Sequence, residues 1–504
     1  MTIDELLEEL SRRGITLALD GSQWRMRAPH GALTEALKAA IAEHKAQLVA
    51  MLPSAAPEAT AKDTPASAHW SELTFEQFMT RGVREFAEAE ELQRWREAMQ
   101  KEGLEAMFDR PHLSAPGPSV DVPQSDGSVT RCVSFTSYNY LGFATHPVVI
   151  QGAKDALDRY GLGALSSPVL GGTLGVHGEL ERGIVEFLGQ PGYGVSLFPS
   201  GYGANTGAIS ALLNENQYLV CDRKVHMSVL EGGKLSGAKV RFFAHNDARD
   251  LERVLAGIDA HRHRVIVAMD GVHSVSGAFG RVDEISEVTK RCGAYLLVDE
   301  AHSMLLTGPG GRGVAAAQGV LDRVDLLVMT MSKSFGGIGG AVYARTDLAN
   351  YINWFARCRM FSCALNPGVV GGLAKVPALA GGPEGEARRK RLMRNAKTLR
   401  ALLCDHLVIG DAESWVIPVY IGSHEKISHL GDWLRRHGLE VGAVSYPAVP
   451  KDASCLRLFV TSEHTDEQFE FAANVLISAA KRFDFLRGRR PSTRRNEPAE
   501  AYAG

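Results

Sequence analysis

The spacing of hydrophobic residues changes several times within the first fifty positions. Leucines recur at helical spacing between residues 6 and 10, which predicts a short helix. Two runs of alternating apolar and polar residues follow at 15–19 and 24–28, on either side of the turn-forming pair Asp20-Gly21. Alternation on both sides of such a pair predicts a β-hairpin.

A second helix is predicted after the hairpin. Thr34 is a good N-cap, and the apolar positions from 37 to 52 follow one helical face. Residues 1–52 are therefore expected to form a helix–hairpin–helix domain. The next segment, 53–70, is rich in Ala, Pro, Ser and Thr. Because it has too few large apolar residues to build a core, we expect a flexible linker.

Beyond residue 70 the pattern predicts a larger α/β unit. A charged helical stretch spans about 75–108, and helical segments then alternate with apolar strands such as 195–198 and 265–268. Such alternation is typical of a mostly parallel sheet covered by helices. Near residue 365 the pattern changes to helices and a few strands, including 455–460, which predicts a smaller α+β lobe. The predicted boundaries are 71–134 for an N-terminal extension, 135–364 for the large domain, 365–486 for the small C-terminal domain and 487–504 for a basic, disordered tail.

Composition and charge argue against several classes of function. The 504 residues have a formal net charge of only −3, and Lys and Arg are scattered through the main body, so no nucleic-acid surface is indicated. Seven cysteines without a C-x-x-C pair argue against a zinc site and a secreted disulfide framework. Neither a signal peptide nor a run of about 18 apolar residues is found. We therefore expect a cytoplasmic protein without a metal site or a membrane span.

Lys333 is the strongest candidate for chemistry. It follows an apolar strand at 326–329 and precedes Gly336 and Gly337, so it lies where open parallel sheets bind ligands. A lysine that is desolvated there loses its proton readily and forms imines. A lysine beside glycines is weak evidence by itself, because most lysines are solvated. Together with the residues that follow, Lys333 predicts a Schiff base to pyridoxal 5'-phosphate (PLP).

A second strand end carries side chains that PLP requires. Asp299 follows the apolar strand 295–298, and a buried aspartate supplies the negative charge that keeps the pyridine nitrogen of PLP protonated. His302, three residues later, is predicted to hydrogen-bond the ring hydroxyl. The alternative is an Asp–His pair that only stabilises the end of the strand.

The phosphate of PLP needs backbone N–H groups at the start of a helix. The turn formed by Ser200, Gly201 and Tyr202 follows a strand and precedes a helical segment, which suits this task. Glycine-rich turns open many helices without binding anything, so the turn is a weak signal when taken alone. Thr330, in the loop of Lys333, is expected to add a hydroxyl.

These residues belong to a series of motifs that resembles the α-oxoamine synthases, a family within fold type I of PLP enzymes, the aspartate-aminotransferase-like fold. Members include 8-amino-7-oxononanoate synthase, 2-amino-3-ketobutyrate ligase, 5-aminolevulinate synthase and serine palmitoyltransferase. The resemblance spans about 135–475. The matching motifs are SYNYLG at 137–142, HGELE at 177–181, SGYGAN at 200–205, DRKVHMS at 222–228, DGVHS at 270–274, DEAH at 299–302, TMSK at 330–333 and SCLRL at 454–458. No single motif is specific, but their common order is.

The resemblance implies roles that spacing alone does not indicate. His226 would stack on the pyridine ring, and Ser274 would assist at the ring hydroxyl. Arg457 would hold the carboxylate of the amino-acid substrate, a task suited to a planar guanidinium; a surface salt bridge is the alternative. Asn139 and His177, which stand in the first two motifs, are expected to contact the substrate.

Further implications concern the assembly. Family members are homodimers with active sites at the subunit interface. The segment 361–363 resembles the part of the chain that reaches the neighbour's phosphate, so Ser362 is counted among the cofactor-binding residues. The residues implied in catalysis are Lys333, His226, Asp299 and His302.

Three positions depart from the family pattern. Pro168 stands where several relatives carry arginine, His273 stands where an aromatic residue is usual, and Ala448 replaces a hydroxyl residue of the oxononanoate synthases. These changes leave the PLP machinery intact, but they leave the preferred amino acid and acyl chain open.

Residues 1–52 resemble a second family, the TubC-type N-terminal docking domains of nonribosomal peptide synthetases. The matching runs are 27–34 and 44–48. Such domains bind the tail of an upstream synthetase and raise the effective concentration of its carrier protein. The alternative is an accessory hairpin that serves stability or dimerisation.

Together the two resemblances predict a PLP-dependent acyltransferase that releases an assembly-line product. An amino acid would displace Lys333 from PLP, Arg457 would hold its carboxylate, and Lys333 would remove the α-proton. The carbanion would attack a thioester on a carrier protein and, after loss of CO2, release an α-aminoketone. An acyl-CoA-dependent synthase of primary metabolism and a catalytically silent scaffold are the alternatives.

Overall fold

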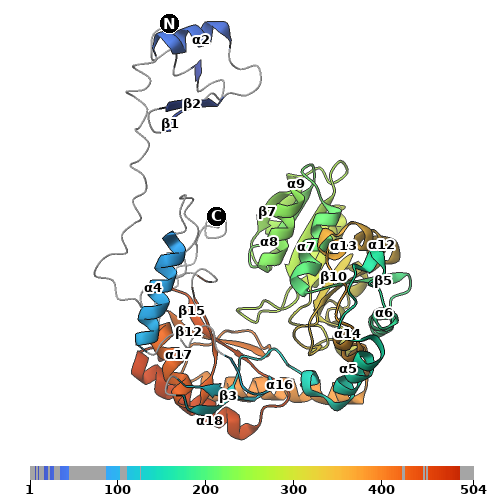
Figure 1. Ribbon diagram of the computed structural model, residues 1–504, viewed down its shortest axis with the longest axis vertical. Helices are drawn as coiled ribbons and strands as arrows, with labels where there is room; N and C mark the ends of the chain where they lie inside the picture. The colour runs from blue at the N-terminus through green and yellow to red at the C-terminus, as the bar shows by residue number, and fades with distance from the viewer. Residues whose placement is uncertain are drawn as a thin grey trace. The chain divides into compact units, whose positions relative to one another are not determined.

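The structure, a computed structural model, comprises two compact units (Figure 1). One unit contains Met1–Trp70 and Thr80–Glu91, and the other contains Ser71–Met79 and Leu92–Gly504. The described residues are 6, 9–10, 16–20, 23–27, 34–44, 87–102, 111–124, 127–422, 426–445, 449 and 452–487. The predicted linker, Ala448 and the tail after Arg487 lie outside the described residues.

The smaller unit contains the predicted hairpin and a helix. Strands β1 (Thr16–Asp20) and β2 (Gln23–Arg27) pair antiparallel, with Asp20 opposite Gln23. Helix α2 (Glu35–Glu43) begins at Thr34, whose side chain accepts a hydrogen bond from the backbone N–H of Leu37. Its buried face explains the apolar spacing of the sequence. Among the described side chains of this unit, the buried apolar ones include Leu6, Leu10, Leu37, Ala40 and Ile41.

A seven-stranded sheet organises the described part of the larger unit. Its strand order is β5-β11-β10-β9-β8-β6-β7. All neighbours are parallel except β11, which runs antiparallel to both β5 and β10. The fold is therefore that of PLP fold type I, as the sequence predicted. The strands are β5 (Tyr193–Phe198), β6 (Tyr218–Asp222), β7 (Lys239–Phe243), β8 (Val265–Asp270), β9 (Tyr295–Asp299), β10 (Leu326–Thr330) and β11 (Gly340–Arg345).

Helices cover both faces of this sheet. Successive strand side chains point to opposite faces, so Val267 and Val298 join one buried cluster, whereas Ile266 and Leu297 join another. The first cluster includes side chains of α9 and α10, and the second includes those of α7, α8 and α12. Burial on both faces explains why the strands read as continuous apolar runs. The helices of this domain are α5 (Pro147–Tyr160), α6 (Gly175–Leu188), α7 (Gly201–Leu212), α8 (Met227–Ser236), α9 (Ala248–Ala256), α10 (Val282–Arg291), α11 (Val314–Ala317), α12 (Thr346–Phe355), α13 (Arg357–Met360), α14 (Pro367–Leu373) and α15 (Val376–Gly381).

The C-terminal lobe contains two small sheets. In the first, β15 (Ser454–Phe459) pairs antiparallel with β12 (Val416–Gly422) and β14 (Gly442–Val444). The second unites segments distant in sequence, because β13 (Leu439–Glu440) pairs with β4 (Val129–Ser134), which in turn pairs with β3 (Ser119–Pro123). The long helix α16 connects the main sheet to the lobe (Figure 1). The remaining helices are α4 (Ala87–Lys101), α16 (Pro383–Leu403), α17 (Ile427–Arg436) and α18 (Asp466–Phe483). Within the described ranges, no helix is long and apolar enough to cross a membrane.

Candidate active site

Charged side chains gather at the carboxyl ends of three adjacent parallel strands. Strand β8 ends at Asp270, β9 ends at Asp299, and Lys333 follows the end of β10 by three residues. The strand register places Asp270 opposite Asp299. Regular pairing of the strands therefore brings these three residues to one edge of the sheet, which is where such folds bind ligands. We call Asp270, Asp299 and Lys333, with Asn205, the sheet-end cluster.

Lys333 is largely desolvated. Burial lowers the pKa of its amine to about 8, against the opposing attraction of Asp299 and Asp270, and the positive charge of Arg457 lowers it further. The Nζ atom lies 5.6 Å from the centre of the Tyr138 ring. Near neutral pH a substantial fraction of the amine is therefore unprotonated and able to act as a nucleophile or a base.

Asp299 is a buried carboxylate with two fixed donors. Its side chain is 5% exposed; Oδ2 accepts a 2.7 Å hydrogen bond from Asn205 Nδ2, and Oδ1 accepts one of 2.9 Å from the backbone N–H of Ala301. Burial and the negative charge of Asp299 raise the pKa of neighbouring Asp270 well above its usual value. Asp270 therefore takes up a proton more readily than an ordinary aspartate.

A chain of hydrogen bonds connects His226 to this carboxylate. His226 caps α8 and shares a 2.7 Å hydrogen bond between its Nδ1 and Ser228 Oγ. Ser228 Oγ accepts from Asn205 Nδ2 at 2.9 Å, and the same amide group bonds Asp299. Burial lowers the pKa of His226. The negative charge of Asp299 opposes this shift, whereas the positive charges of Lys333 and Arg457 add to it, so the ring is neutral near pH 7. Sequence reasoning assigned no role to Asn205 or Ser228, although both stand in matched motifs.

His302 bonds a tyrosine rather than Asp299. Its Nδ1 lies 2.8 Å from the hydroxyl of Tyr140. Burial lowers the pKa of His302 well below its usual value, and the charges of Lys333 and Arg457 lower it further. The imidazole is therefore neutral. Its hydrogen bonds thus differ from the Asp–His pair considered as an alternative.

Arg457, on β15, is held by uncharged acceptors. It donates to the backbone oxygen of Ser274 at 3.0 Å and to the Tyr138 hydroxyl at 3.1 Å, while its guanidinium lies 4.6 Å from the ring centre of Phe459. Its Nε is buried without a hydrogen-bond partner, and no carboxylate pairs with it among the residues that the structure describes. We call Arg457, Tyr138 and Ser274 the arginine cluster. A guanidinium that is held by neutral acceptors is suited to binding a substrate carboxylate, because a charged acceptor bonds it more strongly.

The predicted phosphate turn is tightly packed against the loop of Lys333. Ser200 caps α7 by accepting a 3.0 Å hydrogen bond from the N–H of Gly203. A Cβ atom on Gly201 would lie 2.6 Å from Thr330 Cβ and 2.7 Å from its Oγ1, so only glycine permits this approach. Tyr202 is half exposed and meets the edge of His226. The first N–H groups of α7 and the Thr330 hydroxyl thus lie together, as an anion site requires.

Three predicted residues make contacts of a different kind. Asn139 accepts from the N–H of Ala144 at 3.2 Å and donates to the oxygen of Pro116 at 3.4 Å. Both ring nitrogens of His177 bond backbone atoms, those of Leu174 and Leu365. Ser362 is partly exposed, and its hydroxyl bonds only the backbone of the next residue within the described chain. Within one subunit, the hydrogen bonds of these three residues do not connect them to the sheet-end cluster.

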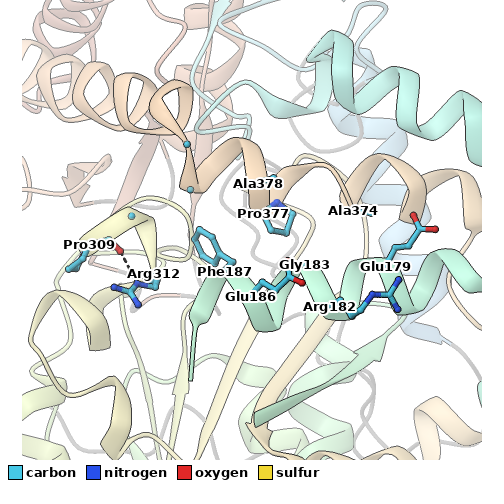
Figure 2. Close-up of a pocket in the computed structure, with 13 residues that line it drawn as sticks. Glu179, Arg182, Gly183, Glu186, Phe187, Pro309, Arg312, Ala374, Pro377 and Ala378 are labelled. Atoms are coloured by element: carbon cyan, nitrogen blue, oxygen red, sulfur yellow. Dashed lines mark hydrogen bonds between the residues drawn. The ribbon is translucent and has the colours of Figure 1, made fainter. Parts of the chain in front are cut away.

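A groove in the described structure lies elsewhere. It has a cavity volume of about 770 Å³ and runs between α6 and α15 (Figure 2), where Glu179, Arg182, Phe187 and Pro377 line it. No predicted site residue faces it. The groove therefore does not mark the chemistry, which the sheet-end and arginine clusters mark instead. Among the described residues, no group of three or more His, Cys, Asp or Glu side chains is arranged to hold a metal ion.

Comparisons with known proteins agree with this geometry. The family model for aminotransferase class I and II matches residues 130–476, and the model for the TubC N-terminal docking domain matches residues 3–53. The chain is 33% identical over 387 residues to serine palmitoyltransferase of Sphingobacterium spiritivorum, which covers 76% of this chain and 94% of that protein. It is also 33% identical over 369 residues to 8-amino-7-oxononanoate synthase of Thermoanaerobacter pseudethanolicus, which covers 72% of this chain and 91% of the relative.

Solved structures give the same result. A serine palmitoyltransferase variant from S. paucimobilis with a bound PLP–myriocin aldimine superposes with a TM-score of 0.74 at 29% identity, over 80% of this chain and all of that chain. The chain therefore belongs to the aminotransferase class I and II family, as a PLP-dependent acyltransferase of the α-oxoamine synthase type that also carries a TubC-type docking domain.

Proposed function

We propose that this enzyme condenses an amino acid with an acyl thioester that a carrier protein delivers, releasing an assembly-line product as an α-aminoketone. The observation that carries the proposal is the docking-domain match at residues 3–53 in the same chain as the acyltransferase. A synthase that takes free acyl-CoA has no need of a docking domain. A domain that binds the upstream synthetase raises the local concentration of its carrier protein without any new contact at the active site.

The residues at the sheet edge fit PLP. Lys333 offers a partly unprotonated amine, Asp299 offers a buried carboxyl group, and the start of α7 lies beside Thr330. Ser200, Gly201 and Thr330 would hold the phosphate. PLP, when bound, supplies an electron sink for negative charge at the α-carbon of the amino acid.

The remaining cofactor contacts are assigned to His226, His302 and Ser274. His226 would cover the pyridine ring, held by its bond to Ser228. His302 and Ser274 would act at the ring hydroxyl. Tyr202, which meets the edge of His226, would contribute to the same end of the site.

Substrate handling falls to Arg457 and Lys333. Arg457 exchanges its bonds to Ser274 and Tyr138 for the two carboxylate oxygens of the amino acid, a charge-assisted replacement of neutral acceptors. Lys333 takes the proton from the α-carbon, because its amine is largely unprotonated above about pH 8. The α-carbon would bond the thioester carbonyl carbon as the carbon–sulfur bond breaks and the thiolate leaves. The carboxylate that Arg457 held would then depart as CO2, and a proton would return to the α-carbon in its place.

We also propose a homodimer. Several large apolar side chains are exposed on the loops at 161–174 and 361–365, whose backbones meet where the N–H of Ala364 donates to Ser166. Contiguous apolar surface of this kind marks an interface, and a second subunit there would place Ser362, Asn139 and His177 in a shared site. The most exposed of these side chains are Leu162, Leu165, Leu170 and Phe361.

Turnover with carrier-bound substrate tests the role of the docking domain. The full chain and a chain lacking residues 1–68 are each given a carrier protein that bears the upstream synthetase's C-terminal tail, the same carrier without the tail, and an acyl N-acetylcysteamine thioester. We expect removal of either the docking domain or the tail to raise the KM for the carrier about 10- to 100-fold. Activity on the small thioester should be unchanged.

The controls separate this proposal from its alternatives. Lys333→Ala in the full chain is the inactive reference. Equal use of tailed and untailed carrier by the full chain, together with rapid turnover of acyl-CoA, would favour the CoA-dependent alternative. Absence of product from every thioester, across a panel of amino acids followed by mass spectrometry, would favour the silent scaffold.

A further inference from the structure

Tyr140 is a buried residue that the reaction described above does not use. Its side chain is 0% exposed, and its hydroxyl lies 2.8 Å from Nδ1 of His302. Among the described residues that hydroxyl has no other hydrogen-bond partner. The two backbones are also anchored, because the N–H of Ser462 donates to the Tyr140 oxygen at 2.8 Å and the Trp415 indole donates to the His302 oxygen at 3.1 Å.

The protonation of the pair follows from its surroundings. Burial raises the pKa of Tyr140 well above its usual value, so it stays a phenol. Burial, followed by the charges of Lys333 and Arg457 and the neighbouring rings of His226 and His273, lowers the pKa of His302 well below its usual value. A neutral imidazole has one nitrogen that donates and one that accepts. The position of its single hydrogen therefore depends on which partner donates in the bond between Tyr140 and Nδ1.

Only one direction of this bond satisfies both groups. If Nδ1 donated, the phenol hydrogen of Tyr140 would be left in a buried site without an acceptor, which is unfavourable. If the phenol donates, Nδ1 accepts and the imidazole hydrogen lies on Nε2. The tautomer of a histidine is set in this way by the hydrogen bond that its other nitrogen makes.

We propose that Tyr140 is a positioning residue that holds His302 as the Nε2–H tautomer, so that His302 presents a hydrogen-bond donor to the oxygen of the cofactor ring. A donor stabilises negative charge on that oxygen, whereas the other tautomer would present a lone pair and repel it. The inference rests on the proposed place of His302 at the ring hydroxyl. Tyr140, in the motif at 137–142, would thus fix which ring nitrogen of His302 carries the hydrogen.

The tautomer is measured directly in the full chain without cofactor. Nitrogen-15 NMR of histidine-labelled protein distinguishes protonated from unprotonated ring nitrogens, and a His302→Asn variant identifies the His302 signals. We expect a protonated Nε2 and an unprotonated Nδ1 between pH 6 and pH 9. In Tyr140→Phe the ratio of the two tautomers should shift by about tenfold toward Nδ1–H, as loss of one buried hydrogen bond implies.

Tyr138→Phe is the matched control. It removes a phenol hydroxyl two residues away, from a ring that lies 5.8 Å from the His302 ring but bonds Arg457 instead. The His302 tautomer should be unchanged in this variant. A protonated Nδ1 in the unmodified chain, or the same tautomer ratio in Tyr140→Phe, overturns the proposal. The first result is obtained without the Tyr140→Phe variant, so a folding defect in that variant does not affect it.

Measurements of PLP binding test whether the tautomer of His302 matters to the cofactor. Tyr140→Phe should weaken PLP affinity about tenfold and move the pH at which the visible absorbance of bound PLP changes. If Tyr140→Phe alters the His302 tautomer but leaves the PLP affinity and the absorbance of bound PLP unchanged, Tyr140 does not position His302 for the cofactor. Neither readout involves a carrier protein, so failure of the proposed acyl donor leaves both outcomes interpretable.

Discussion

The sheet-end cluster and the arginine cluster serve one site but are assembled in different ways. Asp270, Asp299 and Lys333 follow adjacent parallel strands, and the strand register alone brings them together. Arg457 meets Tyr138 and Ser274 only because the C-terminal lobe packs against two other segments of the chain. The first cluster is therefore a product of backbone pairing, and the second is a product of side-chain packing between distant segments.

The difference extends to how firmly the groups are held. Asp299 keeps both donors, Asn205 and the Ala301 N–H, in a buried position, which suits a charge that must stay fixed. Arg457 rests on two neutral acceptors that a substrate carboxylate outcompetes, since a charged acceptor bonds more strongly than a neutral one. The cofactor side is therefore held by buried partners, whereas the substrate side rests on partners that a carboxylate can replace.

The largest expected effect concerns the sheet-end lysine and pH. Lys333 has a pKa lowered to about 8, and only its unprotonated amine attacks the aldehyde of PLP. The rate at which the apo-enzyme captures PLP should therefore fall about tenfold for each pH unit below about 8, and level off above it. Stopped-flow absorbance measures the rate, with N-acetyl-lysine as the reference for the ionisation of PLP itself. If the rate levels off only near the ordinary pKa of a lysine, the amine of Lys333 is not desolvated.

A smaller effect is expected for the fixed donor of Asp299. Asn205→Ala removes hydrogen bonds to both Asp299 and Ser228, and loss of a buried bond to a charged group should weaken PLP affinity about tenfold. Ser228→Ala breaks only the branch toward His226, so we expect a weaker effect from it. Fluorescence titration of the apo-enzymes with PLP measures both. If the two variants weaken affinity equally, the bond to Asp299 is not what holds the cofactor.

The smallest effect is expected for the exchangeable side. Tyr138→Phe removes one of the acceptors that compete with the substrate for Arg457. The KM for the amino acid should fall about threefold with little change in kcat, as loss of one competing hydrogen bond predicts. Steady-state kinetics at saturating acyl thioester measures this. A rise in KM would show instead that Tyr138 holds the guanidinium in its binding position, and the contrast between the two clusters would be lost.

Much of the fold was predictable because it is local in sequence. The alternation of 15–19 and 24–28 predicted the hairpin that β1 and β2 form, and the continuous apolar runs predicted the buried parallel strands. The small sheet that joins β3 and β4 to β13 was not predicted, because its partners lie about three hundred residues apart. The predicted domain boundaries stay predictions.

The site divides along the same line. Lys333 and Asp299 were predicted because each lies at or just beyond the end of an apolar strand, so their position could be inferred from the sequence pattern. Tyr140 and Asn205 were missed as functional residues, although both stand in matched motifs, because their partners are 162 and 94 residues away. A tyrosine or asparagine in a motif suggests a hydrogen bond, but the sequence does not identify the partner residue.

By itself, the sequence determined the family, the cofactor and the apolar strands that precede Lys333 and Asp299, since periodicity and motifs can be read along the chain. Only the tertiary structure decided the electrostatic and hydrogen-bond partners of these groups: that the pKa of Asp270 is raised by burial beside Asp299, that Arg457 bonds Tyr138, and that His302 bonds Tyr140. Those outcomes depend on burial and on distances between side chains, which are set when remote segments pack together.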